Sequence, residues 1–461
     1  MTSSGFIQIT PRSRPADIGP PVFLSSPTSP YVPQMHLFDA DGRPYLLLAN
    51  GSQIFEIEDD IFAELDRARK TRDRQNVDSL IAGLGLDGAP LIGDEAPAAF
   101  PVRALSLSVA QKCNLGCAYC YAQEGTFGDA PRDMTVEAAE GSLDLLFRDA
   151  APGERLNLSF LGGEPLINRA LIQNITRQAA ERAAAQNARI GFSITTNGTL
   201  LKAEDADFFE DYGFAVTISL DGIGKDHDRL RPFKSGAESY ERIIANVRPL
   251  LARQREMQVS ARVTVTPQNL DLVGTLDALI EMGFHSVGFS PMLSSPTGRA
   301  EMDAAALEAM LSQMILCGEK FEQRLSRGAR YPFSNMTNAL REIHKGTHRP
   351  YPCGAGAGYM GVSADGDLFA CHRFVGDEAG RMGDVSAGVD PAARKDWLAG
   401  RHVHTQEPCS GCWARYLCGG GCHHEVINRG RASCDYIRGW LHYCLQAYIR
   451  TLSVRPDYFG A

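Results

Sequence analysis

The sequence contains no apolar run long enough to cross a membrane. A spanning helix needs about 18 or more consecutive apolar residues, and polar residues interrupt every apolar stretch before that length. The first residues, MTSSGFIQITPRSRPADIGPP, also lack the basic start and apolar segment of a signal peptide. We therefore expect a cytoplasmic protein with no membrane partner.

The chain also lacks an excess of positive charge. Its 55 Asp and Glu residues outnumber its 46 Lys and Arg residues, which gives a net charge of −9. A surface that binds nucleic acid carries the opposite sign, so no nucleic-acid partner is expected. With 461 residues, 44% of them hydrophobic, the chain has enough apolar material for about two to four globular domains.

Cysteine, in contrast, is abundant for a cytosolic protein. Of the 12 cysteines, three lie between residues 113 and 120, one at 317, and eight between 353 and 444. A reducing compartment disfavours structural disulfides, so clustered thiols there indicate metal binding or redox chemistry.

Composition divides the chain into five segments. Residues 1–34 are rich in Pro and Ser and are predicted to be a flexible arm, and residues 35–95 a small α+β domain. Residues 103–300 alternate between strand and helix patterns, and residues 301–348 are predicted to form a helical bridge. We expect loops to dominate the cysteine-rich residues 349–461, with metal organising them.

Six short β-rich runs characterise residues 103–300. They cover residues 104–110, 155–161, 189–196, 215–220, 260–266 and 286–292. Both faces of each run are apolar, which is typical of parallel strands buried under helices. Six such strand–helix units predict an α/β fold with a partial (β/α)6 barrel.

Three cysteines directly follow the first run. The stretch KCNLGCAYCYA spaces Cys113, Cys117 and Cys120 as C-x3-C-x2-C, with Tyr119 before the last cysteine. Barrels of this type place their chemistry at the carboxyl ends of strands. Three thiolates can hold three irons of a [4Fe–4S] cluster and leave the fourth iron open to a substrate. The alternatives are free thiols or a zinc site completed by a distant histidine, although structural zinc prefers four protein ligands.

This motif resembles that of the radical S-adenosylmethionine enzymes, which carry an aromatic residue at the position of Tyr119. The resemblance implies that the open iron binds the amino and carboxylate groups of S-adenosylmethionine. Reductive cleavage of this cofactor is then expected to yield a 5′-deoxyadenosyl radical that abstracts hydrogen from a substrate. An electron donor such as a flavodoxin or ferredoxin is implied as a partner.

Two further strand ends supply candidate cofactor contacts. Gly162 and Gly163 permit close backbone approach, and the following Glu164 is an acceptor suited to the cofactor's ammonium. This segment resembles the family's GGEP motif, although a plain turn would use the same residues. Thr196 and Asn197, at the end of the third run, are donors suited to a ribose or a carboxylate.

Charged residues on later strands are also candidates. Arg262, on the fifth run, is predicted to pair with the cofactor carboxylate, with a structural ion pair as the alternative. Asp221, at the end of the fourth run, is predicted to be a general base, with an Asx turn or helix cap as the alternative. Arg229 and Arg231 are candidates for ion pairs.

The eight C-terminal cysteines equal two sets of four, which suits two fully ligated cuboidal clusters. Two zinc sites are the alternative, because C-x2-C also suits zinc. This region resembles the SPASM extension of peptide-modifying radical S-adenosylmethionine enzymes, including its GGGC segment.

The SPASM resemblance implies two auxiliary [4Fe–4S] clusters, which brings the expected total to three. The first would use Cys353, Cys371 and Cys422, and the second would use Cys409, Cys412, Cys418 and Cys434. Some relatives carry an additional cysteine where this chain has Tyr359, so Cys444 is the candidate for the fourth ligand of the first cluster. Cys317 is expected in a helix core.

The stretches CGAGAGYMGVSADGDLFACHRF and CDYIRGWLHYC resemble thioether-forming SPASM maturases, those of quinohaemoprotein amine dehydrogenase most of all. This implies crosslinks from Cys sulfur to methylene carbons of Asp or Glu in a small cysteine-containing peptide or protein subunit. The N-terminal unit resembles the peptide-recognition domains of such maturases, which bind a peptide as an added edge strand. The alternatives are carbon–carbon crosslinking, oxidation of a Ser or Cys side chain, and a zinc-binding peptide scaffold.

Overall fold

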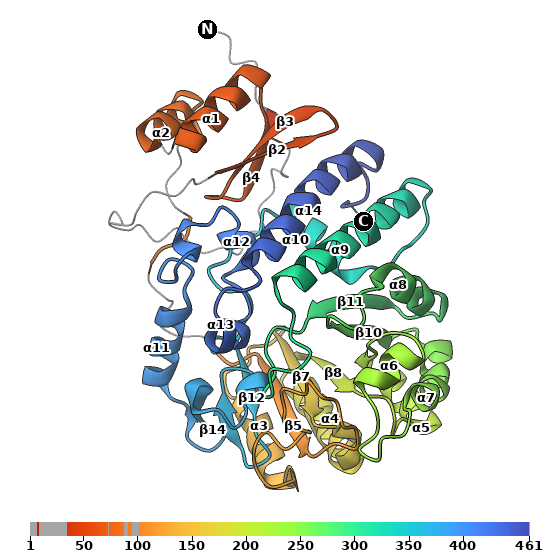
Figure 1. The fold of residues 1–461 in the computed structure, drawn as a ribbon. Helices are drawn as coiled ribbons and strands as arrows, with labels where there is room; N and C mark the ends of the chain where they lie inside the picture. The colour runs from red at the N-terminus through yellow and green to blue at the C-terminus, as the bar shows by residue number, and fades with distance from the viewer. Residues whose placement is uncertain (1–6, 9–34, 72, 87–90, 95–100, 461) are drawn as a thin grey trace.

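The structure is a computed structural model that describes residues 7–8, 35–71, 73–86, 91–94 and 101–460. It confirms the expected fold class, a mixed α/β architecture around a partial barrel (Figure 1). Apart from residues 7–8, the predicted arm at residues 1–34 lies outside the described residues. Among the helices of the described part, none combines the length and apolar character needed to cross a membrane.

Six parallel strands form the barrel, and each coincides with a predicted run to within two residues at either end. They are β5 (Ala104–Gln111), β7 (Arg155–Gly162), β8 (Arg189–Thr196), β9 (Ala215–Ser219), β10 (Gln258–Val265) and β11 (Ser286–Pro291). Their order in the sheet follows their order in the chain. All six carboxyl ends therefore meet at one edge, where the candidate site residues lie.

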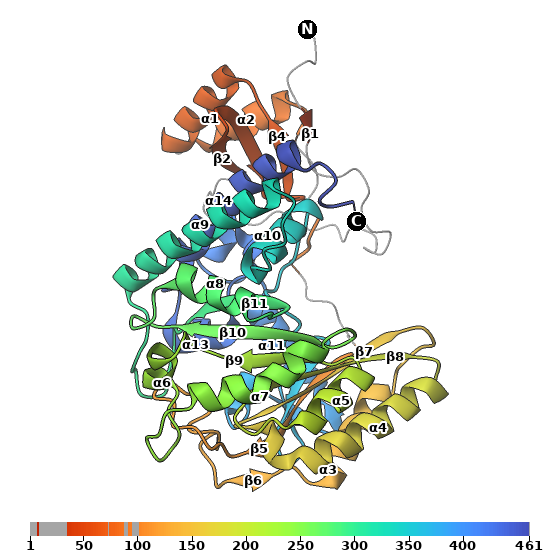
Figure 2. The same ribbon diagram turned by 90° about the vertical axis from the view of Figure 1, so that its right-hand side faces the viewer.

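Helices cover the outer face of these strands (Figure 2). They are α3 (Val136–Phe147), α4 (Arg169–Ala185), α5 (Ala203–Asp211), α6 (Lys225–Leu230), α7 (Tyr240–Arg253) and α8 (Leu272–Glu281). Capping side chains define several of their starts: Thr135 accepts from Ala138 N, and Asp271 accepts from Gly274 N. The helices bury one face of each strand, and burial alternates along β7, β9 and β10. The expectation of two apolar faces therefore holds for β5 but not for these three strands, whose other face lines the interior of the partial barrel.

The barrel sheet continues into the cysteine-rich region, which corrects the expectation that loops dominate it. β12 (Tyr359–Val362) pairs in parallel with β5, and three antiparallel strands follow. These are β13 (Asp367–Phe369), β14 (Arg381–Asp384) and β15 (Gly388–Val389). Strands of two to four residues are too short to show a clear alternation of apolar and polar positions in the sequence.

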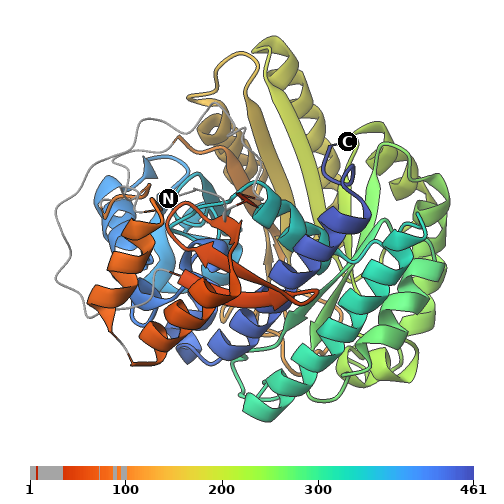
Figure 3. The ribbon, with the colours of Figure 1, turned by 90° about the horizontal axis from the view of Figure 1, so that it is seen from above.

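Long helices complete the C-terminal half. α9 (Ala304–Ser326) and α10 (Ser334–His344) occupy most of the predicted helical bridge, and both pack against α14 (Cys434–Val454). Seen from above, α9 and α14 run side by side (Figure 3). The shorter α11 (Pro391–Arg401), α12 (Arg415–Cys418) and α13 (His423–Arg429) lie among the cysteines of this region.

The N-terminal elements form a small sheet followed by two helices. The sheet order is β1 (Ile7–Gln8), β4 (Gln53–Glu56), β3 (Arg43–Leu48) and β2 (Met35–Ala40), with every pair antiparallel. The helices are α1 (Asp59–Thr71) and α2 (Arg74–Gly83).

This N-terminal sheet is buried on both faces. Successive β3 side chains alternate between two cores, because Leu46 and Leu48 pack with α1 and α2, whereas Tyr45 and Leu47 belong to the main core. β2 also contacts α14. The unit predicted at residues 35–95 is therefore anchored to the rest of the protein through one face of its sheet.

Candidate functional site

The three-cysteine loop leaves the carboxyl end of β5 and is held against a second loop. Gly116 N donates to Pro232 O at 2.8 Å, and Lys234 N donates to Asn114 O at 3.1 Å. These backbone hydrogen bonds position the loop while leaving the cysteine side chains free for another purpose.

The thiols of Cys113, Cys117 and Cys120 lie close enough to influence one another's charge. Burial raises the pKa of Cys117 to about 12, and the neighbouring Arg231 opposes that rise. Metal binding requires the thiolate form. The positive charge of Arg231 beside the thiols favours the thiolate form that a metal centre would use.

Gly162 and Gly163 end β7 directly against this loop. A Cβ at Gly163 would lie 2.4 Å from Lys112 O and 2.7 Å from Gly125 Cα. Gly162 has a φ of +142°, and its Cβ would lie 2.3 Å from Ala110 O. No side chain fits at either position. The backbone at these glycines does approach another group closely, as predicted. In the structure, that group is the backbone of β5 and of the three-cysteine loop.

Glu164 is fully buried and connects the ends of β7 and β8. Its carboxylate accepts hydrogen bonds from Thr196 Oγ1 at 2.7 Å, Asn197 N at 2.8 Å and Leu166 N at 3.1 Å. The Asn197 side chain in turn lies 3.7 Å from Cys113 Sγ. The predicted residues thus form one network beside the loop. The partners of Glu164 here are protein donors, and its contact with a cofactor ammonium stays a prediction.

Asp221 is buried together with Tyr119 and Arg231. Its Oδ2 accepts from the Tyr119 hydroxyl and lies 3.4 Å from Arg231 Nη1, while its Oδ1 accepts from Thr264 N at 2.8 Å. Arg231 also donates to the Tyr119 hydroxyl at 2.8 Å. The carboxylate has no exposed surface. These contacts support a positioning role for Asp221, and its role as a general base stays a prediction.

The charges of Asp221 and Arg231 indicate the role of the buried trio that they form with Tyr119. Burial raises the pKa of Asp221, and Arg231 opposes the rise. Burial lowers the pKa of Arg231, but Cys117 and Asp221 more than offset this, so the guanidinium remains charged. The ion pair expected of Arg231 is present. We infer that Asp221 positions Tyr119 and Arg231 beside the cysteine loop.

Arg262 on β10 donates to the hydroxyl of Ser290 on the neighbouring β11. Its side chain keeps contact with solvent, yet enough protein surrounds the guanidinium for burial to lower its pKa. Within the described residues, Arg262 takes part in none of the ion pairs with Asp or Glu. It can therefore accept an anionic ligand, and its pairing with a cofactor carboxylate stays a prediction.

Cys353, Cys371 and Cys422 come together from distant parts of the C-terminal region, and their thiols influence one another's charge. Burial raises the pKa of Cys371 to about 12. Arg373 Nη1 lies 3.9 Å from Cys422 Sγ and also pairs with Glu425. These three thiols are the set predicted for the first auxiliary cluster.

Cys444 does not join this set, which corrects its prediction as the fourth ligand. It lies on α14 with no exposed surface, inside the apolar core, and its charged neighbour is Glu322 of α9. Burial in this core raises its pKa well above the usual value. Cys444 therefore resembles Cys317, which is buried on α9 as predicted.

Tyr359 and His372 lie beside the first auxiliary set. The Tyr359 hydroxyl donates to Ser106 Oγ on β5 at 2.9 Å and lies 2.8 Å from His372 Nδ1. Burial lowers the pKa of His372 to about 4, so the ring is neutral. Tyr121 neighbours both this set and the last cysteine of the three-cysteine loop. An aromatic and hydrogen-bonded layer thus connects the two groups of thiols.

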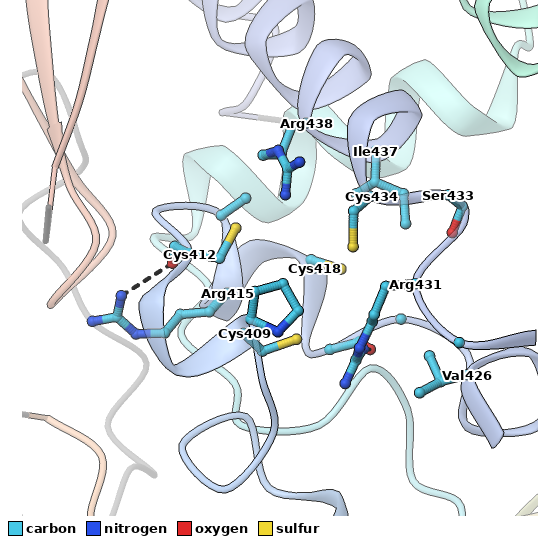
Figure 4. A pocket seen from close by; sticks show the side chains of 15 residues that line it. Cys409, Cys412, Arg415, Cys418, Val426, Arg431, Ser433, Cys434, Ile437 and Arg438 are labelled. Atoms are coloured by element: carbon cyan, nitrogen blue, oxygen red, sulfur yellow. Dashed lines mark hydrogen bonds between the residues drawn. The ribbon is translucent and has the colours of Figure 1, made fainter. Parts of the chain in front are cut away.

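The four cysteines predicted for the second auxiliary cluster line a single pocket (Figure 4). The sulfur atoms of Cys409, Cys412, Cys418 and Cys434 point into the same space. Nowhere in the described residues do three or more His, Cys, Asp or Glu side chains approach closely enough to hold a single metal ion. Four thiols around one pocket can each bind one iron of a cluster, as predicted for this set.

Several charged residues of these sites were missed from the sequence. Arg373 follows Cys371 by two residues, and Arg431 and Arg438 stand three before and four after Cys434. These short spacings from cysteines were the feature of the sequence that could have indicated these arginines as site residues. The buried partner of Arg373, Glu425, lies 52 residues further along the chain, too far to be paired by spacing.

Comparison with known families identifies the barrel. Residues 107–279 match the model of the Radical SAM superfamily. The matched residues include Cys113, Cys117 and Cys120 and most of the barrel strands, so this part of the chain is similar to the radical SAM superfamily. The match confirms the prediction of S-adenosylmethionine and iron–sulfur chemistry as the cofactor class.

Similar proteins extend beyond that domain. The serine-type anaerobic sulfatase-maturating enzyme of Klebsiella aerogenes is 24% identical, over 78% of this chain and 89% of its own. A radical SAM cyclopropyl synthase of Paramaledivibacter caminithermalis is 23% identical, over 72% of each chain. The solved structure of native anSMEcpe with bound AdoMet has a TM-score of 0.63 at 18% identity, and covers 76% of this chain and 99% of that one. At this identity, the structural likeness shows a shared fold.

The different environments of two cysteines predict different effects of substitution. Cys371→Ala should remove the iron of the first auxiliary centre, because its thiol belongs to the converging set. Cys444→Ala should keep all iron and lower the free energy of unfolding by about 1 kcal/mol, as expected for a small core change. Anaerobic iron and sulfide analysis with thermal unfolding of both variants checks this. Equal iron loss in both would return Cys444 to the ligand set.

The buried trio predicts that Asp221→Asn affects the cofactor site as a whole. Removing the carboxylate charge leaves Arg231 buried without its ion-pair partner, at a cost of about 3 kcal/mol. We expect 5′-deoxyadenosine formation and substrate modification to fall together, with displaced loop geometry visible in the cluster spectrum. The control is Asp226→Asn, whose pair with Arg229 is largely exposed. Normal 5′-deoxyadenosine formation with lost modification would instead indicate a base.

Proposed function

We propose that this protein is a radical S-adenosylmethionine maturase that modifies a small cysteine-containing peptide or protein subunit. The observation that carries the proposal is the presence of three thiol groups in one fold. One lies at the carboxyl ends of the barrel strands, and two lie in the C-terminal region that resembles a SPASM extension. We assign a [4Fe–4S] cluster to each.

The chain's residues have separable roles in this proposal. Cys113, Cys117 and Cys120 would hold the cluster that binds S-adenosylmethionine. When bound, this cofactor supplies removal of a hydrogen atom from an unactivated C–H bond, which no side chain could remove as a proton. Arg231 stabilises the thiolates, and Arg262 offers a cation for the cofactor's carboxylate. A flavodoxin or ferredoxin would be the electron donor.

The reaction that we favour is formation of a thioether between a Cys sulfur and a methylene carbon of Asp or Glu. Its support is the likeness of residues 353–374 and 434–444 to thioether-forming maturases. A second candidate is oxidation of a Ser or Cys side chain, which the sulfatase-maturating relative favours. Both reactions need a peptide to reach the barrel, and a related structure is that of native anSMEcpe with AdoMet and the Cp18Cys peptide.

The N-terminal sheet offers a means of holding such a peptide. Its β4 edge already pairs with an extended segment of the chain, because Ile7 lies opposite Glu56 and Gln8 opposite Phe55 in an antiparallel arrangement. The β2 side of the sheet instead contacts α14. We therefore assign peptide docking to the β4 edge, by main-chain hydrogen bonds.

Mass spectrometry of a small cysteine-rich polypeptide tests the reaction. Incubated anaerobically with reductant and S-adenosylmethionine, it should lose about two hydrogens per crosslink, and each crosslink should protect one thiol from alkylation. The Cys117→Ala enzyme is the matched control. Oxidation of a Ser side chain would leave every thiol open to alkylation, and a colourless, iron-free protein would favour the zinc scaffold over both reactions.

Removing residues 1–8 tests the docking edge, because it removes the strand β1 that pairs with β4. If a substrate peptide uses this edge, its affinity should rise several-fold in the shortened protein. Fluorescence anisotropy with a labelled peptide measures this, and deletion of residues 1–5 alone is the control because it keeps Ile7 and Gln8. Unchanged affinity after both deletions would place peptide docking elsewhere.

A further inference from the structure

Positive charge surrounds the pocket of the second auxiliary set. Its lining contains Arg415, Arg431 and Arg438, and none of the described residues that line it is Asp or Glu. Figure 4 shows the side chains of Arg431 and Arg438 beside the cysteine sulfurs. Arg431 opposes the rise in the pKa of Cys409 that burial causes, which places its charge within reach of this thiol.

Two of the arginines beside the other thiol groups have buried carboxylate partners, whereas Arg349, near Cys353, pairs at 3.5 Å with Glu342, whose side chain is 33% exposed. Arg231, next to the three-cysteine loop, pairs with Asp221, whose side chain is 0% exposed. Arg373, next to Cys422, pairs with Glu425, whose side chain is 9% exposed. In both places a nearby negative charge in a poorly solvated environment cancels much of the arginine's field.

Among the described residues, neither Arg431 nor Arg438 of the second auxiliary pocket has a buried carboxylate partner. Arg431 donates to two neutral oxygens, Gly420 O and, at 2.6 Å, Gln406 Oε1. Arg438 pairs with Asp435, but the carboxylate side chain is 97% exposed, so solvent screens it. The second pocket therefore retains more positive potential than the first auxiliary site.

We propose that Arg431 and Arg438 raise the reduction potential of the second auxiliary cluster above that of the first. This rests on the proposed function, which places a cluster at each set. Reduction adds a negative charge to a cluster, and nearby uncompensated cations stabilise that charge. One electron on the first auxiliary cluster then passes spontaneously to the second, which is reduced as the first is oxidised. The second cluster is therefore the final acceptor, within this protein, of an electron taken from the substrate.

Anaerobic redox titration of the full-length protein, followed by electron paramagnetic resonance, tests this order. The spectra of Cys371→Ala and Cys434→Ala assign each signal to its cluster. We expect the second auxiliary cluster to be reduced first. Arg431→Gln, which removes the charge and keeps a donor for Gly420 O, should shift its midpoint to a more negative potential and leave the first cluster unchanged. Arg431→Lys keeps the positive charge, so its midpoint should lie close to that of the unmodified protein.

Two further variants complete the design. Glu425→Gln should shift only the first auxiliary cluster, to a more positive potential, because it uncovers Arg373. Arg455→Gln removes an exposed arginine at the end of α14 and should shift neither. If Arg431→Gln loses iron at its site, the same shift is measured in Arg438→Gln.

Three outcomes decide the matter. A second cluster that is reduced after the first in the unmodified protein overturns the inference. Unchanged midpoints in iron-complete Arg431→Gln or Arg438→Gln also overturn it. Absence of iron from the second set in the unmodified protein would refute the auxiliary clusters of the proposed function, and the inference with them.

Discussion

Cysteine thiols inside the protein must lose their protons to bind iron, and every centre assigned to this chain depends on that constraint. Burial raises the pKa of Cys117 and of Cys371 to about 12 even though an arginine beside each opposes the rise, Arg231 at the barrel and Arg373 in the C-terminal region. These thiols therefore keep their protons until a metal binds and displaces them. Asp221 and Glu425, which pair with the two arginines, hold them in place and offset part of their charge.

Much of the fold could be predicted because its signals are local. Each barrel strand is a short apolar run bounded by polar residues, and the spacing of Cys113, Cys117 and Cys120 lies within eleven residues of sequence. The hydrogen bond between Tyr119 and Arg231 joins residues 112 positions apart. Such a contact is set by how the strands lie in the sheet, and no spacing rule in the sequence contains it.

The errors in the site have physical reasons. Cys444 was assigned by counting thiols, and counting does not distinguish a ligand from a small apolar residue on the buried face of a long helix. For Asp221, the strand end says where the backbone lies but not whether the side chain faces solvent or the interior, so the burial of this side chain could not be predicted and its base role stays a prediction. The strand β12 was missed because four residues, one of them glycine, carry no recognisable period.

Continuity of the sheet between β5 and β12 has a mechanical consequence. The three-cysteine loop leaves the end of β5, and Tyr359, at the start of the paired β12, binds Ser106 of β5 beside the first auxiliary thiols. Hydrogen-bonded strands of one sheet move together, so we expect the distance between the three-cysteine loop and the first auxiliary set to change little. If each centre holds its proposed cluster, this pairing would keep the distance for electron transfer between the two clusters nearly fixed when a peptide binds.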